Sequence, residues 1–400
     1  MEKRRIIGVD IGSEAVKVLM GTTENSGQVN IFASGSAPTM GFLKGRIVDA
    51  GALAYAVKQA IDCVSVSEGI RSDDCVFIGV SGDLLKVRDE LVGGDILDAP
   101  PEDWEQLCRE KVLAASDASE RILHTLPRSI SAWPDTAELD SEPVSTSPQV
   151  RVHVVSSEAL VMESFQTALQ NVGIHVDGLV ANPVVGVLQL FDGVSRSEPL
   201  RYLFLDVGAG TVDWAVYDRT VLASGSLPVG GEYITRDIMQ GIGVSRLHAE
   251  EIKRYYARLD RQCYGQNVLL DCNDYGTVDK NVPFDFLYDI VESRVEEIVQ
   301  LMEEHLMENL PEGVPGKMDQ VFMSGGCSAL PGMSQQLEQV FAAPVQVVQP
   351  RRTGMEYARP DYMACVGILQ HAAAHLPARK DDSGGRWGSM VRHMRKLLGN

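Results

Sequence analysis

The feature that most constrains this 400-residue chain is a hairpin motif that occurs twice. Residues 202–218, YLFLDVGAGTVDWAVYD, place an aspartate and two glycines between two apolar runs of strand length. Near the N-terminus, RRIIGVDIGSEAVKVLMG has the same order: an apolar run, Asp10, Gly12, a hydroxyl at Ser13 and a second apolar run. Glycine lets backbone N–H groups converge on a polyanion because no Cβ intervenes. Two such hairpins far apart in sequence predict two similar halves that face one ligand.

The residues of the two turns suit a phosphate-bearing ligand and its Mg²⁺. The second turn offers Asp206, Gly208, Gly210, Thr211 and Asp213. Magnesium is usually held by one or two carboxylates together with substrate phosphates, so Asp10 and Asp206 are expected to share the ion through water. Lys17 leaves the first turn on a strand and either lies beside a phosphate or is solvated. For either turn taken alone, an ordinary hairpin with solvated aspartates is the alternative.

Size and composition narrow the function classes. A chain of 400 residues exceeds a single core, so two or more domains are expected. The formal charge of −19 argues against nucleic acid as a partner, because phosphate backbones bind basic faces. The seven cysteines form no C-x-x-C pair, which argues against a zinc site or a disulfide framework. No apolar run reaches the length of a transmembrane helix, so a soluble, cytoplasmic chain is expected.

Three later motifs add candidate binding residues. Gly230 and Gly231 stand just before a helical pattern, where backbone N–H groups and the helix dipole favour an anion; a plain loop is the alternative. Glu250 and Lys253 lie three residues apart on one predicted helix face, able to contact a ribose or each other. Gly325 and Gly326 follow an apolar strand and precede a helix, so a flat base is able to lie against bare backbone.

In this order, the motifs resemble the actin-like ATPase superfamily, and within it the chain resembles the FtsA family of bacterial cell-division proteins. The closer resemblance rests on GFLKGRIVD, VFIGVSG, RILHTLPRSISAW and GIHVDGLVANP. It implies an α/β, actin-like two-lobed fold of duplicated ribonuclease-H-like domains, with an FtsA-type α+β insertion subdomain and a C-terminal amphipathic helix. The expected parts are residues 1–83 and 158–199 for lobe 1, 84–157 for the insertion, 200–229 and 317–375 for lobe 2, 230–316 for subdomain 2B, 376–385 for a linker and 386–400 for a membrane-targeting helix.

The resemblance also assigns roles to residues. It implies ATP and Mg²⁺ as ligands, with the two turns and the Gly230–Gly231 pair at the phosphates, Glu250 and Lys253 at the ribose, and Gly325 and Gly326 at the adenine. Ser13 keeps the hydroxyl that relatives supply from threonine. Asn182 stands where hydrolytic relatives place a Glu or Gln that positions water, and Asn cannot act as a base. We therefore expect ATP binding with weak or absent hydrolysis and assign no catalytic residue.

The last fifteen residues, RWGSMVRHMRKLLGN, predict an amphipathic helix. Its apolar stripe has helical spacing, and four Lys or Arg occur without an acidic residue. Such a helix suits the interface of an anionic membrane, lying in plane; packing on its own protein is the alternative. The expected membrane contacts are Trp387, Met390, Val391, Met394, Leu397, Leu398, Arg392, Arg395 and Lys396.

The family resemblance implies a protein that polymerises on the cytoplasmic face of the inner membrane at the division site and tethers FtsZ filaments. Its expected partners are the FtsZ C-terminal tail, further copies of itself, anionic lipid and later division proteins. Arg294, in the helical segment DIVESRVEEIVQLMEEHL, matches a family position for the FtsZ tail; an intrahelical pair with Glu297 is the alternative. A small-molecule kinase or a pilus-assembly scaffold of the same fold are the competing functions.

Overall fold

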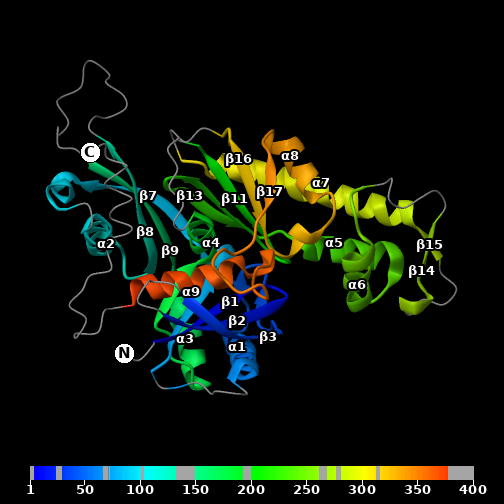
Figure 1. The fold of residues 1–400 in the computed structure, drawn as a ribbon, viewed down its shortest axis with the longest axis horizontal. Helices are drawn as coiled ribbons and strands as arrows, with labels where there is room; N and C mark the ends of the chain where they lie inside the picture. The colour runs from blue at the N-terminus through cyan, green and yellow to red at the C-terminus, as the bar shows by residue number, and fades with distance from the viewer. Residues whose placement is uncertain are drawn as a thin grey trace, which may run out of the picture.

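Two five-stranded sheets with the same strand order form the framework of the protein. The computed structural model describes residues 4–23, 29–65, 71, 73–100, 103–131, 149–191, 200–260, 268–275, 281–311 and 316–376. The first sheet has the order β10-β6-β1-β2-β3 and the second the order β17-β16-β11-β12-β13. In each printed order, the first three strands are parallel to their neighbours. The third, fourth and fifth strands form an antiparallel meander. The predicted duplication of an α/β lobe is therefore confirmed (Figure 1).

The strands alternate or run apolar as the sequence pattern predicts, and their inward side chains form the lobe cores. The first sheet consists of β1 (Arg5–Ile11), β2 (Ala15–Thr23), β3 (Val29–Pro38), β6 (Cys75–Val80) and β10 (Gly178–Ala181). The second consists of β11 (Tyr202–Val207), β12 (Val212–Asp218), β13 (Thr220–Leu227), β16 (Gln320–Ser324) and β17 (Val345–Val347). The small hairpin β4 (Phe42–Leu43) and β5 (Arg46–Ile47) follows β3, and the short turn η1 (Gly82–Leu84) follows β6.

Two buried helices join the lobes, and each packs on the sheet opposite to the one expected. The sequence assigned α4 (Asn182–Phe191) to lobe 1 and α9 (Met363–His375) to lobe 2. Instead, α4 packs mainly on β11, β12 and β13, while α9 packs on β1, β2 and β6. The two helices also pack on each other, and both are apolar on nearly all faces, so their periodicity does not select a sheet. The remaining lobe helices are α1 (Ala50–Ser65), α3 (Ala159–Asn171) and α8 (Met333–Phe341).

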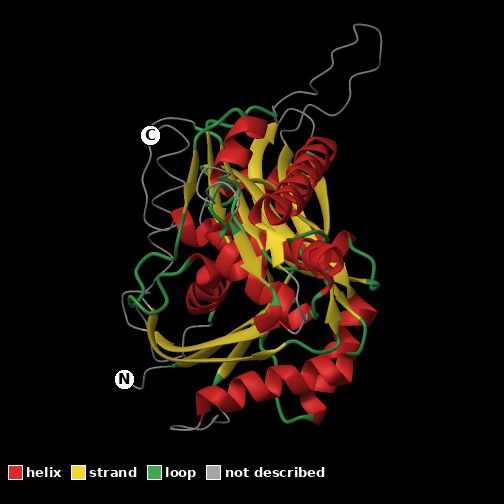
Figure 2. Ribbon diagram, turned by 90° about the vertical axis from the view of Figure 1, so that its right-hand side faces the viewer, coloured by secondary structure: helices red, strands yellow, loops and turns green. Residues whose placement is uncertain are grey.

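The insertion and an elongated arm lie at opposite ends of the long axis (Figure 1). The insertion comprises β7 (Lys86–Gly93), η2 (Gly94–Asp98), α2 (Trp104–Ala115), β8 (Glu120–Ser131) and β9 (Gln149–Glu158), with sheet order β7-β9-β8. The arm comprises α5 (Gly231–Ile238), the π-helical turn η4 (Met239–Gly243), α6 (Arg246–Tyr256), β14 (Leu269–Asp271), η6 (Asn273–Tyr275), β15 (Asn281–Pro283) and the long helix α7 (Phe284–Asn309). Seen from the arm end, helices flank the strands on both sides (Figure 2).

A histidine-rich seam joins the insertion to α9. His124 of β8 and His371 of α9 lie edge to face with ring centroids 5.1 Å apart, and His371 stacks on His375 at 3.9 Å. The backbone N–H of Ala181 donates to His124 Nε2 at 2.9 Å, so His124 must be neutral at that nitrogen. Burial lowers the pKa of His124 to about 3, with nearby cationic groups adding to the effect.

We expect acid to weaken this seam. Between pH 6.5 and 3 the unfolded chain protonates His124 while the folded chain does not, so this residue removes stability as the pH falls. The loss amounts to about 2 kcal/mol at pH 5, from 1.36 kcal/mol per pH unit. Asp206, whose pKa is raised, changes the folding stability in the opposite direction over part of the same pH range. Glu105 raises the pKa of the neighbouring His375. The measurement is therefore the free energy of unfolding in urea for wild type and His124→Gln, each at pH 7.5 and at pH 5. An equal change in this free energy between the two pH values in both proteins would contradict the prediction.

Candidate functional site

The two predicted turns have the same hydrogen-bond geometry. In the first, the N–H of Gly12 donates to the Ala15 carbonyl at 3.2 Å, and in the second the N–H of Gly208 donates to the Thr211 carbonyl at 2.9 Å. The strand register places Asp10 opposite Lys17 in the first hairpin. In the second it places Asp206 opposite Asp213. The two hairpins are therefore structurally equivalent, and Asp10 and Asp206 occupy corresponding positions.

The turns meet across the interface between the lobes. A Cβ on Gly210 would lie 2.2 Å from Ser13 Oγ, so only glycine fits there. Ser13 Oγ is buried and has no hydrogen-bond partner in the described part of the chain. An unpaired buried hydroxyl is costly, and this one lies at the turn expected to receive a phosphate.

A cluster of three carboxylates lies between the turns, with Asp10 and Asp213 buried and Asp206 partly buried. Burial raises the pKa of Asp206 to about 7, and the neighbouring negative charge of Asp10 adds to the rise. Burial raises the pKa of Asp10 as well, against the opposing effects of Lys17 and of the Asn182 amide, which donates to Asp10 Oδ1 at 2.9 Å. The pKa of Asp213 is raised well above its usual range, mainly by burial. Negative charge is thus costly here unless a cation is present, and oxygen donors of this kind suit Mg²⁺.

The Gly230–Gly231 segment lies directly against the second turn. The N–H of Gly231 donates to the Gly208 carbonyl at 3.0 Å and the N–H of Glu232 donates to the Ala209 carbonyl at 2.8 Å. A Cβ on Gly230 would lie 2.5 Å from the same Gly208 oxygen. The first amides of α5 are therefore bonded to the chain itself, and a phosphate at this helix end would have to replace those carbonyls.

Glu250 and Lys253 form the predicted pair on α6. Lys253 Nζ lies 2.6 Å from Glu250 Oε2, and Thr235 Oγ1 of α5 donates to the same carboxylate oxygen at 2.6 Å. The charge of Lys253 lowers the pKa of Glu250, although burial opposes the shift. The pair therefore also ties α6 to α5. The predicted contact between the two side chains is therefore present in the structure.

Gly325 and Gly326 lie beside the acidic cluster. Gly325 has φ of 86°, and a Cβ on it would lie 2.4 Å from Asp206 Oδ1. Among the described residues, no atom lies within 4 Å of the position that a Cβ on Gly326 would take. Bare backbone with open space beside it fits the predicted contact with a flat ring.

Two charged residues at the site were missed by the sequence analysis. Lys44, in the hairpin between β4 and β5, crosses to the arm, where its Nζ donates to the Tyr233 hydroxyl at 2.6 Å and lies 4.4 Å from that ring's centroid. Asp361, in the turn η8 (Pro360–Tyr362), lies 3.0 Å from Lys17 Nζ. The glycines that flank Lys44 in the sequence marked a special turn, whereas nothing local distinguishes Asp361 from a surface aspartate.

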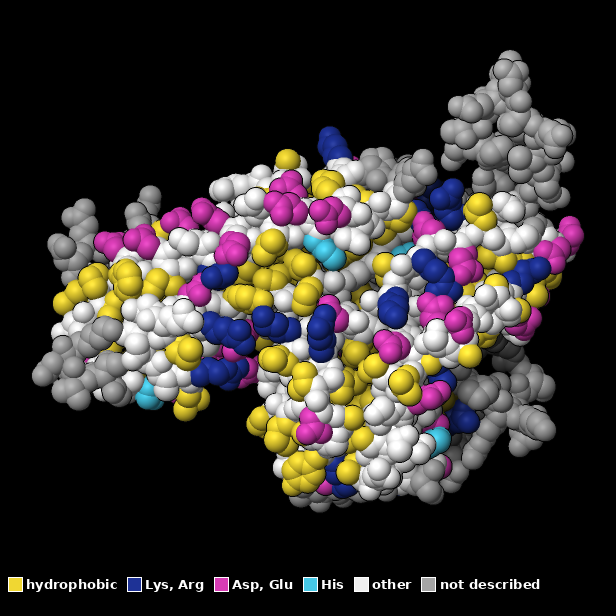
Figure 3. All heavy atoms as spheres, turned by 180° about the vertical axis from the view of Figure 1, so that it is seen from behind, with side chains coloured by type: hydrophobic (Ala, Val, Ile, Leu, Met, Phe, Trp, Pro, Cys, Tyr) yellow, Lys and Arg dark blue, Asp and Glu magenta, His cyan; other side chains and the backbone are white. Residues whose placement is uncertain are grey.

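Cationic side chains from both lobes gather near Tyr233 and Glu14. Figure 3 shows a row of Lys and Arg side chains across the middle of one face of the molecule. Arg246 Nη2 donates to Glu14 Oε2 across the lobes at 2.8 Å. Arg294 binds Glu297 at 2.6 Å and Asp237 at 2.5 Å, and its guanidinium lies 5.6 Å from the Tyr233 ring centroid. The intrahelical pair predicted as the alternative for Arg294 is therefore present, together with a second carboxylate.

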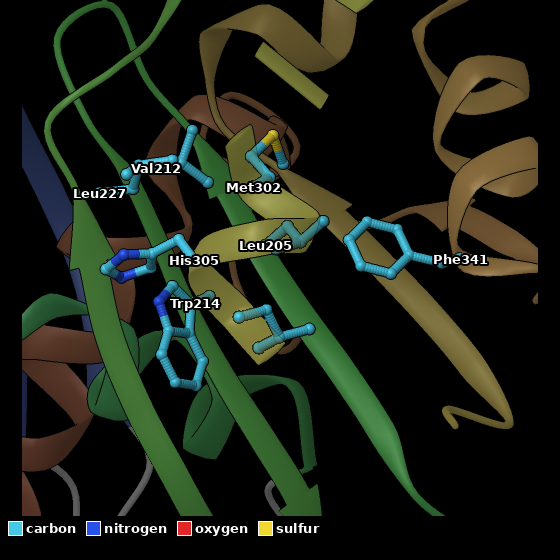
Figure 4. Close-up of a pocket in the computed structure, with 8 residues that line it drawn as sticks. Leu205, Val212, Trp214, Leu227, Met302, His305 and Phe341 are labelled. Atoms are coloured by element: carbon cyan, nitrogen blue, oxygen red, sulfur yellow. The ribbon is translucent and has the colours of Figure 1, made fainter. Parts of the chain in front are cut away.

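A small cavity in the second lobe is separate from these residues (Figure 4). It holds about 10 Å³, room for roughly one water molecule, and Trp214 Nε1 beside it is buried without a partner in the described part of the chain. Its lining consists of Leu205, Val212, Trp214, Leu227, Met302, His305, Leu306 and Phe341. An apolar cavity of this size is packing space within the lobe and not a ligand site.

The predicted membrane contacts, from Trp387 to Leu398, lie outside the described residues. Within the described ranges, no helix has both the length and the apolar character to cross a bilayer. The same ranges contain no group of three or more His, Cys, Asp or Glu side chains placed to hold a metal. Any magnesium at Asp10 and Asp206 would thus take its remaining ligands from water and phosphate.

Known proteins resemble the chain in both sequence and fold. The family model described as "Cell division protein FtsA" matches residues 203–367. The cell division protein FtsA of Pseudomonas aeruginosa is 24% identical, over 92% of this chain and 89% of the relative. Among solved structures, the PilM–PilN type IV pilus biogenesis complex matches with a TM-score of 0.64 at 19% identity, covering 92% of this chain and 98% of that one. MreB5 of Spiroplasma citri, bound to AMPPNP, matches with a TM-score of 0.54 at 13% identity, covering 93% and 96%. At such identities the two structures show the fold alone, which is actin-like. In sequence the chain is thus similar to the FtsA cell-division proteins, and its fold is actin-like.

Proposed function

We propose that the chain binds Mg²⁺–ATP between its lobes, polymerises on the cytoplasmic face of the membrane at the division site, and tethers FtsZ filaments there. The observation that carries the nucleotide part is the pair of equivalent turns, with Asp10 buried and Asp206 partly buried at corresponding positions. The membrane part rests on the basic, apolar-faced terminal segment of the sequence. The tether part rests on the sequence similarity to FtsA proteins and on the cationic junction at Arg294.

The residues present fit the nucleotide in three respects. The buried carboxylates are hard oxygen donors that a divalent cation would relieve of mutual repulsion. Ser13 Oγ is an orphaned buried hydroxyl at the first turn. The backbone at Gly326 has open space beside it. When bound, Mg²⁺–ATP would supply the cation for the carboxylates and the phosphates for the turns.

In this proposal the residues between the lobes bind and position the nucleotide, and Asn182 does not supply a general base. Asn182 holds Asp10 through its amide N–H, and its Oδ1 has no partner among the described residues. An amide does not accept a proton from water at neutral pH, so the proposal is nucleotide binding with weak or absent hydrolysis. The proposed role of the nucleotide is to set the relative position of the lobes, and with it polymerisation.

An acidic peptide suits the junction around Arg294. The Arg294 side chain is 23% exposed, and Lys44 and Arg236 lie around the same Tyr233 ring. Incoming carboxylates would compete there with Asp237 and Glu297 for charge-assisted hydrogen bonds. The fold likeness to the pilus complex lends no separate weight to a pilus role, because 19% identity shows the fold alone.

Cosedimentation of the full chain with FtsZ and vesicles containing phosphatidylglycerol, with and without Mg²⁺–ATP, tests this function. We expect the wild type to bring FtsZ to the vesicles. Arg294→Glu should lose most of the FtsZ and keep the lipid, because the change reverses the charge offered to an acidic tail. Removal of residues 386–400 should lose the lipid and keep FtsZ binding.

The matched control is Arg254→Glu, which changes an exposed arginine paired with Glu250 on the neighbouring helix α6. Indifference of lipid binding to the truncation would reject the membrane part and favour a soluble kinase. Equal FtsZ recovery with Arg294→Glu and Arg254→Glu would reject the docking surface.

A further inference from the structure

We propose that Asp361 is an internal competitor for the phosphate that Lys17 would bind, so that its carboxylate lowers the affinity of the cleft for nucleotides. The inference rests on the proposed nucleotide function and adds a residue that tunes it. The turn η8, which carries Asp361, lies between the two lobes and belongs to neither predicted phosphate motif.

The contacts of Lys17 show that its ammonium group is already occupied. Lys17 Nζ donates to Asp361 Oδ2 at 3.0 Å and also to the Asp361 backbone carbonyl. The ring of Tyr362 lies beneath it, with the centroid 5.3 Å from Nζ. Both members of the ion pair are largely removed from solvent, each side chain being 22% exposed. An ion pair at this depth is held more firmly than one on the surface.

Asp361 is itself held in place from two sides. Arg359 donates to both carboxylate oxygens, from Nε at 3.0 Å and from Nη2 at 2.8 Å. On the second lobe, the Pro360 carbonyl accepts from Ser324 Oγ at 2.7 Å and from the Gly325 N–H at 3.3 Å. The carboxylate is thus aimed at Lys17 by a bidentate arginine and by a turn fixed to the strand that borders Asp206.

The charges around Lys17 explain why this arrangement opposes a phosphate. The Lys17 ammonium group interacts electrostatically with three carboxylates, those of Asp10, Asp361 and Asp206. A polyphosphate approaching Lys17 would meet the Asp361 carboxylate at the same Nζ. Phosphate binding would therefore either break the hydrogen bond between Lys17 and Asp361 or place the phosphate close to the negative Asp361 carboxylate. Either outcome costs free energy and lowers the affinity for the nucleotide.

The test is nucleotide affinity of the full-length protein by titration calorimetry with Mg²⁺–ATP. Asp361→Asn keeps the size and one acceptor oxygen while removing the charge, so we expect affinity to rise by roughly tenfold. Asp361→Ser is a second variant in case the asparagine perturbs the turn. The matched control is Asp95→Asn, which removes an aspartate charge paired with Lys111 on the insertion. Circular dichroism checks that each variant is folded.

A double-mutant cycle separates action through Lys17 from a general charge effect. In a Lys17→Met background, the gain from Asp361→Asn should largely disappear, because the cation for which both anions compete is absent. Adenosine, which lacks phosphate, should bind wild type and Asp361→Asn equally. ATP affinity unchanged by Asp361→Asn, a gain that persists fully in Lys17→Met, or an equal gain for adenosine would each overturn the inference. If neither wild type nor Asp361→Asn binds ATP, both the proposed nucleotide function and the inference about Asp361 are rejected. If only the variant binds ATP, both are supported.

Discussion

Replacing Asp206 by Asn should make the nucleotide-free protein more stable and should at the same time abolish Mg²⁺-dependent stabilisation by ATP. In the folded protein, burial and the charge of Asp10 raise the pKa of Asp206 to about 7 from an ordinary value of 3.8. At pH 8 the carboxylate is ionised in both states, so the folded state bears a cost on the order of 4 kcal/mol that Asn does not have. The wild type should recover that loss when a divalent cation and phosphates surround the carboxylate.

The measurement is thermal and urea unfolding at pH 8 with and without Mg²⁺–ATP. For the wild type at a hundredfold excess over Kd, ligand binding adds about 2.7 kcal/mol, whereas Asp206→Asn should gain little. Asp218→Asn, at the far end of the same hairpin, is the control because it changes an aspartate paired with Arg219 away from the cleft. An Asp206→Asn protein that is less stable without ligand, or that keeps the full Mg²⁺ effect, contradicts the account.

The turns were predictable from sequence because their chemistry is local. Asp10 with Gly12 and Asp206 with Gly208 stand at fixed spacings between strand-length apolar runs, and the structure gives both turns the same N–H to carbonyl bond. The helix assignment at a long periodic segment, DIVESRVEEIVQLMEEHL in α7, agrees with the structure for the same reason. Repetition within one chain supplied the architecture, since two equivalent hairpins require two equivalent lobes.

What the sequence did not predict depends on contacts between distant segments. The helices α4 and α9 are apolar on nearly all faces, so their patterns state that they are buried but not against which sheet. Strand β7 was not predicted because its sequence, KVRDELVG, is an exposed, charged edge. Asp361 acquires its role only because residues 344 positions apart meet in the fold. The sequence analysis noted that Asn182 lacks the chemistry of a general base, but it did not predict the hydrogen bond to Asp10, which joins residues 172 positions apart.

The second large effect is expected at Gly82, where two backbones touch. Gly45 and Gly82 have φ of 75° and 68°, and a Cβ on Gly82 would lie 2.2 Å from the Cα of Gly45. No rotamer relieves a clash between a Cβ and backbone, so the hairpin between β4 and β5 would have to move away from η1. With the left-handed strain added, we expect Gly82→Ala to cost at least about 3 kcal/mol of unfolding free energy.

Gly173→Ala separates the two contributions to that cost. Gly173 has a similar φ of 83°, but no atom in the described part of the chain lies within 4 Å of its would-be Cβ. Gly173→Ala should therefore cost only about 1 kcal/mol of unfolding free energy. The clash also reaches the site, because the Gly82 N–H donates to Ser226 Oγ at 2.9 Å and Ser226 in turn donates to Asp213. Gly82→Ala should therefore weaken Mg²⁺–ATP binding in any molecules that remain folded, whereas Gly173→Ala should leave it unchanged. The measurement is the free energy of unfolding of the two variants in urea. Equal losses of this free energy in Gly82→Ala and Gly173→Ala would mean that the close approach of Gly45 to Gly82 adds nothing to the backbone strain.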